Sequence, residues 1–348
     1  MSRNLASAFF PLELILKLFA LGNFEHFPGQ LSIYFTNSYI IIVWLIYFSF
    51  AIYFEYNKFI CKDIIGFIMF NSKLFTTVTM VMSLQYYKQT RKRCLDKITL
   101  INDTLERLQI PNKYQSLHNR IKRNILVWIL ITVSINITQL SWYKDNLKEI
   151  KSYLLIYTIN HPSIANSLMH MKYESVIWYT ASIFEKINKY ILHLSLNKNN
   201  DSETSKRTSE AFKRSNYQRL IDTPQYKRSL LTIMHVHLEL SKICYEFHKT
   251  FEIELTIEMV TQFIYILGYV QAQHIYFKFT LSYMFDFTPV VLSMVISLFN
   301  VIFINNTIEK CCTKVKRTEH ALHILRDFTY DPERQEEIFQ FILQITQK

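Results

Sequence analysis

The sequence predicts an all-α protein, a polytopic membrane helical bundle of six spans with its N-terminus and C-terminus in the cytoplasm. Two observations carry this prediction. Five runs of 19 to 22 residues contain no charged side chain, and a helix that rises 1.5 Å per residue needs about 20 such residues to cross a bilayer. In addition, segments rich in Lys and Arg alternate with poor ones, and this bias sets the orientation of a membrane protein.

The charge-free runs define most of the spans in chain order. They are Ile33–Phe54, Asn124–Tyr143, Ser152–Met171, Met259–Phe277 and Phe287–Ile308. We count Ile64–Tyr87 as a further span, although it carries one charge, Lys73, which we expect to face the protein interior or a water-filled cavity.

The orientation follows from the basic residues between the runs. The loop at 88–123 holds 10 Lys and Arg residues, 195–228 holds 8 and 309–348 holds 7. By contrast, 144–151 holds 3, and the link between the last two spans holds only Lys278. Because the rich segments belong on the cytoplasmic side, the N-terminus lies there too.

This topology divides the chain into three parts. Residues 1–32 form a cytoplasmic N-terminal segment, and residues 309–348 form a cytoplasmic C-terminal helical segment. Between them lies the transmembrane bundle, 33–308, with cytoplasmic loops at 88–123 and 195–250. The net charge of +11 then reflects topology and contact with anionic lipid headgroups, and we expect no nucleic-acid partner.

Apolar periodicity predicts helices outside the spans. An amphipathic helix on the membrane surface is indicated by Leu12, Ile15, Leu16 and Phe19. The fourth span is expected to continue as one helix to about Leu194, bent near Pro162. A polar linker, Asn197–Ser215, has the composition of a disordered segment.

Two further helices are expected towards the C-terminus. From about Tyr226 to Thr250 a 3.6-residue pattern runs straight into the fifth span, which predicts one long rod. In the tail, Asp331-Pro332 is a typical helix start, with an apolar stripe after it.

The sequence argues against an enzyme. Its 4 glycines leave no GxGxxG, Walker-type or GxSxG motif, and no Ser/His/Asp or Cys/His set is readable as an active site. We therefore expect no cofactor. His235-x-His237, and Cys311-Cys312 with His320 and His323, lack the spacing of a structural zinc site, so we expect no metal.

Polar and aromatic residues in the outer halves of the spans are candidates for ligand binding, because polar groups inside a membrane are costly unless paired. Gln271 and His274 are three residues apart and share a helix face. The simpler interpretation is that such residues bond to neighbouring helices, with Trp142 and Tyr283 in the aromatic belt. The candidates are Asn71, Lys73, Trp142, Tyr157, His161, Gln271, His274, Tyr283 and Asp286.

Three segments carry a resemblance to a known family. The tail CCTKVKRTEHALHILRDF…RQEEIFQFILQI resembles the cytoplasmic segment before the last span of insect gustatory receptors. The phrase IFEKINKYIL resembles that family's pattern at the inner end of the fourth span, with Asn188 in the recurring asparagine position. The run MHVHLELSKICYEFHKTF resembles the segment that leads into its fifth span.

The resemblance implies a gustatory chemoreceptor subunit in the plasma membrane, part of a ligand-gated nonselective cation channel that assembles as a homo- or hetero-tetramer. A small-molecule tastant would bind in the outer half of each subunit's bundle. The family has seven spans, and the last, with a TYxxxxxQF-like signature, lines its pore. This sequence reaches Lys348 before that span, so we expect it to be non-conducting when expressed alone.

Two alternatives stay open. Insect odorant receptors share the fold, and an odorant receptor subunit would give the same topology. A membrane transporter would usually show repeated halves and spans broken at midplane, which Pro162 and Pro289 do not provide.

Overall fold

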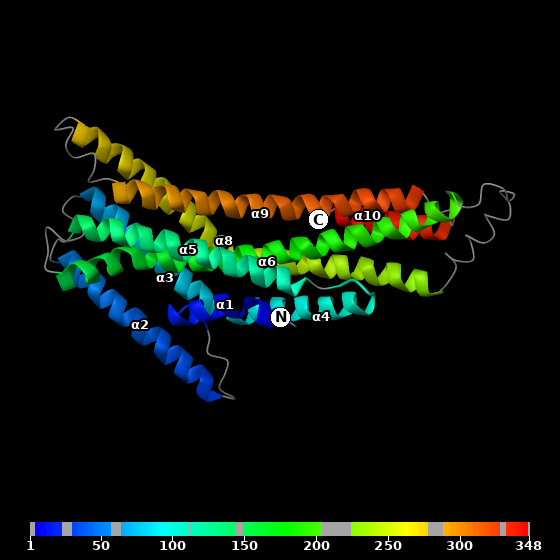
Figure 1. The fold of residues 1–348 in the computed structure, drawn as a ribbon, viewed down its shortest axis with the longest axis horizontal. Helices are drawn as coiled ribbons and strands as arrows, with labels where there is room; N and C mark the ends of the chain where they lie inside the picture. The colour runs from blue at the N-terminus through cyan, green and yellow to red at the C-terminus, as the bar shows by residue number, and fades with distance from the viewer. Residues whose placement is uncertain are drawn as a thin grey trace. The chain divides into compact units, whose positions relative to one another are not determined.

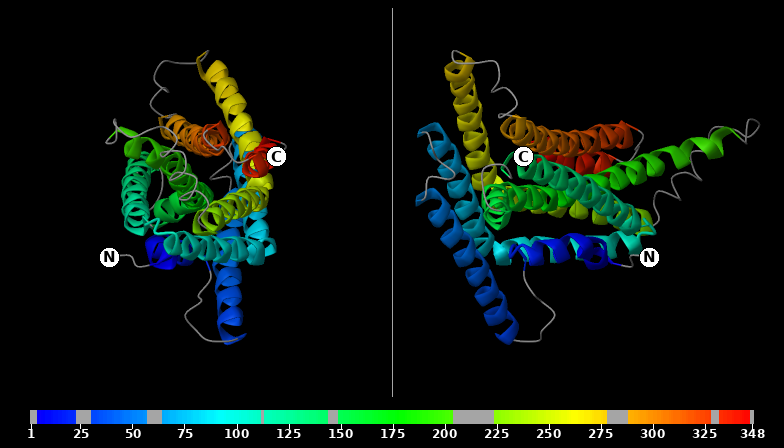
Figure 2. Two further views of the ribbon diagram at one scale, coloured as in Figure 1. Left: turned by 90° about the vertical axis from the view of Figure 1, so that its right-hand side faces the viewer. Right: turned by 60° about the vertical axis from the view of Figure 1, so that its left-hand side comes forward.

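The computed structural model describes residues 4–22, 30–56, 64–111, 113–143, 149–203, 224–277, 288–327 and 332–346. Within these ranges every regular element is an α-helix and none is a strand (Figures 1 and 2). The all-α prediction is confirmed for this part of the chain. In order, the helices are α1 (Leu5–Leu18), α2 (Gln30–Tyr56), α3 (Ile64–Tyr86), α4 (Lys88–Arg107), α5 (Tyr114–Tyr143), α6 (Glu149–Glu203), α8 (Pro224–Phe277), α9 (Thr288–Asp327) and α10 (Pro332–Thr346).

Helix α1 begins at a capping box. The Asn4 side chain accepts a 2.8 Å hydrogen bond from the Ser7 amide, and the Ser7 hydroxyl accepts one from the Asn4 amide at 3.3 Å. These bonds satisfy amides that the first helical turn leaves unpaired. The buried stripe of α1 includes Leu12 and Leu16, and the helix packs against α5. The predicted amphipathic helix is confirmed, and its place at the membrane surface stays a prediction.

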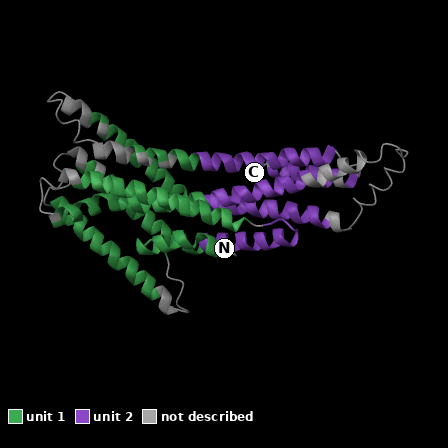
Figure 3. Ribbon diagram, viewed as in Figure 1, with its two compact units in different colours: residues 1–89, 113–175, 249–305 green, residues 90–112, 176–248, 306–348 purple. Residues whose placement is uncertain are grey.

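The chain divides into two compact units, coloured separately in Figure 3. Unit 1 comprises residues 1–89, 113–175 and 249–305, and unit 2 comprises 90–112, 176–248 and 306–348. Among the described helices, α6, α8 and α9 are divided between the two units, and α4 has its first two residues in unit 1 and the rest in unit 2. The core of unit 2 contains the fully buried side chains Leu105, Phe184, Leu240, Leu322 and Phe341.

The long rods agree with the apolar periodicity. Helix α8 runs without interruption from Pro224 to Phe277, as predicted for the fifth span and the segment before it. Helix α10 begins at Pro332, as the Asp-Pro signal predicted. Helix α6 passes through Pro162 as one element.

The connection predicted at 88–123 contains α4 and the start of α5, and its place in the cytoplasm stays a prediction. Helix α4 has a mainly polar surface and a buried stripe that includes Cys94, Ile98 and Leu105. The linker predicted at Asn197–Ser215 is helical as far as Glu203, since each residue added to an existing helix gains a backbone hydrogen bond. The rest of that linker lies outside the described residues.

Among the described residues, two helical segments are long and apolar enough to cross a membrane, Tyr34–Tyr56 and Tyr114–Leu140. Both expose large apolar side chains, including Leu45 at 60% and Leu130 at 59%. Soluble monomers rarely present continuous apolar surface of this kind. The other four spans, and the orientation, stay predictions.

Candidate functional site

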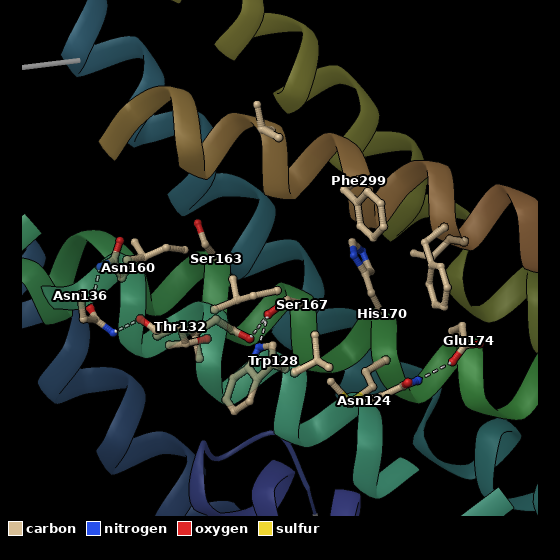
Figure 4. Close-up of a pocket in the computed structure, with 18 residues that line it drawn as sticks. Asn124, Trp128, Thr132, Asn136, Asn160, Ser163, Ser167, His170, Glu174 and Phe299 are labelled. Atoms are coloured by element: carbon tan, nitrogen blue, oxygen red, sulfur yellow. Dashed lines mark hydrogen bonds between the residues drawn. The ribbon is translucent and has the colours of Figure 1, made fainter. Parts of the chain in front are cut away.

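A pocket of about 400 Å³ lies within unit 1 between α5, α6 and α9 (Figure 4). Its volume falls in the range of roughly 300 to 1,000 Å³ that small-molecule sites usually have. Helix α6 supplies most of the polar side chains and α9 supplies an apolar wall. The pocket is lined by Asn124, Val127, Trp128, Ile131, Thr132, Ile135, Asn136, Asn160, Ser163, Ile164, Ser167, His170, Met171, Glu174, Val295, Phe299, Phe303 and Ile304.

An amide cluster closes one end of the pocket. The Asn160 side-chain nitrogen donates to Asn136 Oδ1 at 2.8 Å and to Gln139 Oε1 at 2.5 Å. Asn136 in turn donates from Nδ2 to the backbone carbonyl of Thr132 at 2.9 Å. Because these bonds occupy both side-chain N–H groups of Asn160, the cluster fixes α5 to α6 and offers few free donors to a ligand.

An indole group closes the middle of the pocket floor. Trp128 on α5 donates a 2.8 Å hydrogen bond from Nε1 to the Ser167 hydroxyl on α6. The Ser167 hydroxyl in turn donates a 2.9 Å hydrogen bond to the backbone carbonyl of Ile164, one turn earlier. This bond satisfies the polar end of the indole, so that its ring faces the pocket as an apolar surface.

An ion pair closes the other end. Glu174 is almost completely buried, and it accepts a 2.5 Å bond from Arg120 Nη2 and a 3.4 Å bond from Asn124 Nδ2. A buried carboxylate is tolerated only when it is paired and hydrogen-bonded. The negative charge at this end of the pocket is therefore already balanced.

Three polar side chains of the lining make no hydrogen bond to another described residue. They are Thr132, Ser163 and His170. His170 is 8% exposed and points from α6 towards the side on which α9 carries Phe299 (Figure 4). Such groups can bond to an incoming molecule without first breaking a side-chain contact.

The wall on α9 is apolar. Phe299 and Phe303 stack one turn apart, with ring centroids 6.4 Å apart and planes 13° from parallel. Val295 adds a branched side chain on the same face. Among the described lining residues, the Ser167 hydroxyl is bonded to Trp128 and to the Ile164 carbonyl and makes no hydrogen bond to His170. The described residues also contain no group of three His, Cys, Asp or Glu side chains that would hold a metal.

The candidates of the second span have other partners. Asn71 donates from Nδ2 to Glu55 Oε1 on α2 at 2.9 Å. The ammonium of Lys73 lies 4.4 Å from the ring centroid of Tyr265 on α8, a cation–π contact. Neither residue lines the pocket, and a role for them in ligand binding stays a prediction.

His161 and Tyr157 belong to an aromatic cluster on the other side of α6. The His161 ring has centroid distances of 4.8 Å to Tyr47, 5.0 Å to Tyr157 and 5.1 Å to Trp44. Phe19 stacks on the same ring at 6.1 Å. Both ring nitrogens of His161 are buried without a hydrogen-bond partner in the described part of the chain. The cluster ties the end of α1 and α2 to α6, and neither His161 nor Tyr157 is among the residues that line the pocket described above.

The remaining candidates are placed only in part. Gln271 is exposed on α8. Trp142 and His274 lie in helices, but their side chains are outside the described set, and Tyr283 and Asp286 fall entirely outside the described residues. Ligand binding by these residues stays a prediction.

Sequence reasoning missed the residues that line the pocket, although the sequence holds a signal for them. Polar side chains recur every three or four residues along one face of α6, from Asn160 to Glu174. Most of this stripe, from Asn160 to His170, lies within the charge-free run Ser152–Met171, and a polar stripe in such a run indicates a face turned away from lipid. Also missed was the buried network in which Asn166 donates to Glu258 Oε2 at 2.9 Å and Gln262 donates to Glu258 Oε1 at 2.9 Å.

Comparison with known proteins adds one result. The model of a family described as 7tm Chemosensory receptor matches residues 21–348. No curated protein matches the chain.

Proposed function

Because this chain belongs to the 7tm chemosensory receptor family, whose members bind small chemical ligands in a membrane, we propose that it is a gustatory receptor subunit. In this proposal it spans the plasma membrane six times with its N-terminus in the cytoplasm. It forms part of a ligand-gated, nonselective cation channel and works in a homo- or hetero-tetramer with related subunits.

The pocket between α5, α6 and α9 is the single observation that carries the proposal. It has the volume of a small-molecule site, a mainly apolar lining and a few polar side chains that make no hydrogen bond to another described residue. Two of its lining residues, Asn136 and Asn160, belong to the halves of the third and fourth predicted spans that we expect to face outside.

Gating follows from differential binding. A ligand shifts a conformational equilibrium only by the difference between its affinities for the two states. In the pocket a ligand would touch α6 and α9 together, and each of these is one continuous helix that contributes residues to both units. A ligand that changes the distance between α6 and α9 at the pocket would therefore also move the rest of each helix.

An odorant receptor subunit is the alternative, and the apolar wall of Val295, Phe299 and Phe303 favours it specifically, because volatile ligands are small and apolar. The two functions predict different ligands for one pocket. A test panel therefore has to contain non-volatile tastants and volatile compounds.

The proposal is tested by whole-cell recording from cells that express this chain alone and together with a gustatory receptor subunit. We expect at least one tastant to evoke a cation current in the co-expressing cells that differs from the current of the partner alone. Ile131→Trp, which fills the pocket, should remove that difference. Ile129→Trp is the matched control, because Ile129 is an exposed residue of α5 outside the lining. Identical currents with and without this chain across the panel would refute the proposal.

A further inference from the structure

We propose that the pocket selects a small uncharged molecule with an apolar, preferably aromatic body and one hydrogen-bonding group, which bonds to His170 while the body packs against Phe299. This inference rests on the proposed function, in which the pocket is the ligand site. It names the class of ligand, and it excludes sugars, carboxylates and protonated amines.

The polar groups of the lining are mostly saturated by one another. The Asn160 donors are used by Asn136 and Gln139, and the Trp128 donor is used by Ser167. A ligand hydroxyl that enters the pocket loses its hydrogen bonds to water and finds few side chains there that can replace them. Each buried polar group without a partner costs about 1 to 3 kcal/mol. A sugar carries several hydroxyls, so its transfer into this pocket is unfavourable.

The charges of the lining are balanced. Glu174 is the acidic residue of the lining, and Arg120 already neutralises it at 2.5 Å. A protonated amine would have to compete with that guanidinium. No Lys or Arg is among the described residues that line the pocket, so a carboxylate would be buried there without a counter-ion from them. An isolated buried charge is far more costly than a neutral polar group.

Two of the three available polar groups, Ser163 and His170, are too far apart to anchor the same small molecule. Ser163 and His170 lie seven residues apart on α6, which is a rise of about 10 Å along a helix. A small molecule that bonds to one of them leaves its body against apolar side chains. His170 is the better anchor, because its ring both donates and accepts and it lies on the side of Phe299 (Figure 4).

The test uses one ring with different head groups. The full chain in lipid nanodiscs is titrated with toluene, benzyl alcohol, benzoate, benzylammonium and glucose, and binding is measured by saturation-transfer NMR. We expect benzyl alcohol to bind best and toluene to bind about fivefold to tenfold more weakly, since a net hydrogen bond contributes about 1 kcal/mol. Benzoate, benzylammonium and glucose should give no saturable signal at the same concentrations.

Two variants assign the signal to the site. Ile131→Trp should abolish saturable binding, whereas Ile129→Trp, also an exposed Ile of α5, should leave it intact, which separates the pocket from partition into lipid. His170→Leu should lower the affinity for benzyl alcohol to that for toluene and leave toluene unchanged.

The outcomes separate this inference from the proposed function. If glucose or a charged probe binds more tightly than benzyl alcohol and Ile131→Trp abolishes that binding, the ligand class is wrong and the pocket stands. If His170→Leu leaves benzyl alcohol unaffected, the anchor is wrong. If no probe shows binding that depends on residue 131, the pocket is not the ligand site and the proposed function loses its main support as well.

Discussion

Asn188 on α6 donates a 2.8 Å hydrogen bond from its side-chain nitrogen to the backbone carbonyl of Lys314 on α9. The hydroxyl of Thr318, one turn further along α9, donates to Asn188 Oδ1 at 2.5 Å. All three groups belong to unit 2, and both side chains of the second bond are buried. The nitrogen and the oxygen of the Asn188 side-chain amide thus both bond to α9 and hold it against α6. This gives a physical reason for an asparagine at the position that the family resemblance singled out.

Replacing this amide should destabilise unit 2. In Asn188→Ala the carbonyl of Lys314 loses a donor, and the buried hydroxyl of Thr318 loses its shorter hydrogen bond and keeps only the 3.3 Å bond to the Lys314 carbonyl. The free energy of unfolding should fall by about 1 to 3 kcal/mol. Denaturant unfolding in mixed micelles measures the change. Asn306→Ala, on an exposed residue of α9, is the control and should change the stability by less than about 0.5 kcal/mol. Equal effects of the two variants would show that the amide does not hold the helices together.

The Arg120–Glu174 ion pair at the end of the pocket should contribute more to the free energy of unfolding than the exposed Arg123 does. Arg120→Met leaves Glu174 buried without its main partner, and the removal of one member of a buried pair costs about 3 to 5 kcal/mol. Arg123→Met removes an exposed Arg three residues later and should have little effect. The double variant Arg120→Met with Glu174→Gln should recover much of the loss, because no uncompensated charge remains. A double variant no more stable than Arg120→Met alone would contradict this assignment.

Acid should weaken unit 2 through Glu185. Hydrogen bonds from Lys314 at 2.6 Å and Lys189 at 2.9 Å lower the pKa of Glu185 to about 2. Since the pKa is lower in the folded state than its ordinary value of about 4.5, the contribution is present above pH 4.5 and is lost as the pH falls from there to about 2. Glu185 is 45% exposed, so the contribution should be below about 1 kcal/mol. The midpoint of thermal unfolding, measured against pH, should fall less between pH 4.5 and 2 in Glu185→Gln than in the unsubstituted chain. The same pH dependence in both would contradict a contribution from Glu185.

The orientation is tested with tags. Because Lys and Arg are concentrated in 88–123, 195–228 and 309–348, tags at residue 1, at residue 205 and after residue 348 should be cytoplasmic. Tags near Lys148 and Lys278 should lie outside. Antibody labelling of intact cells measures this, with permeabilised cells as the control. Labelling of residue 205 in intact cells would overturn the topology.

The fold was predictable where one residue pattern decides it. The long apolar periods of α8 and the Asp-Pro start of α10 depend only on local sequence, and both were found. Helix α4 was not predicted because its many charged residues are typical of a loop, although Cys94, Ile98 and Leu105 repeat at helical spacing. That stripe is buried by other parts of unit 2, which the composition of the segment does not reveal.

The pocket was less predictable than the fold. The position of a residue along a span can be estimated from the sequence, and this suggested outer-half residues such as Asn71 and His161. Which neighbour a polar residue faces depends on the packing of the helices. His161 turns into an aromatic cluster, while Asn160, one residue earlier, turns towards α5 and the pocket. Neighbouring residues of a helix point about 100° apart, so the positions of the surrounding helices determine which of the two residues faces the pocket.

The central claim is that small ligands occupy the space beside His170, between α5, α6 and α9. Cysteine protection tests it most directly. Ser167→Cys, one turn from His170 in the lining, and Ile129→Cys are labelled with a small maleimide, with and without benzyl alcohol, against the unsubstituted chain as background. The account predicts that benzyl alcohol slows the labelling of residue 167 in a saturable way and leaves the labelling of residue 129 unchanged. It would be contradicted if benzyl alcohol did not slow the labelling of residue 167, or slowed the labelling of residues 167 and 129 equally.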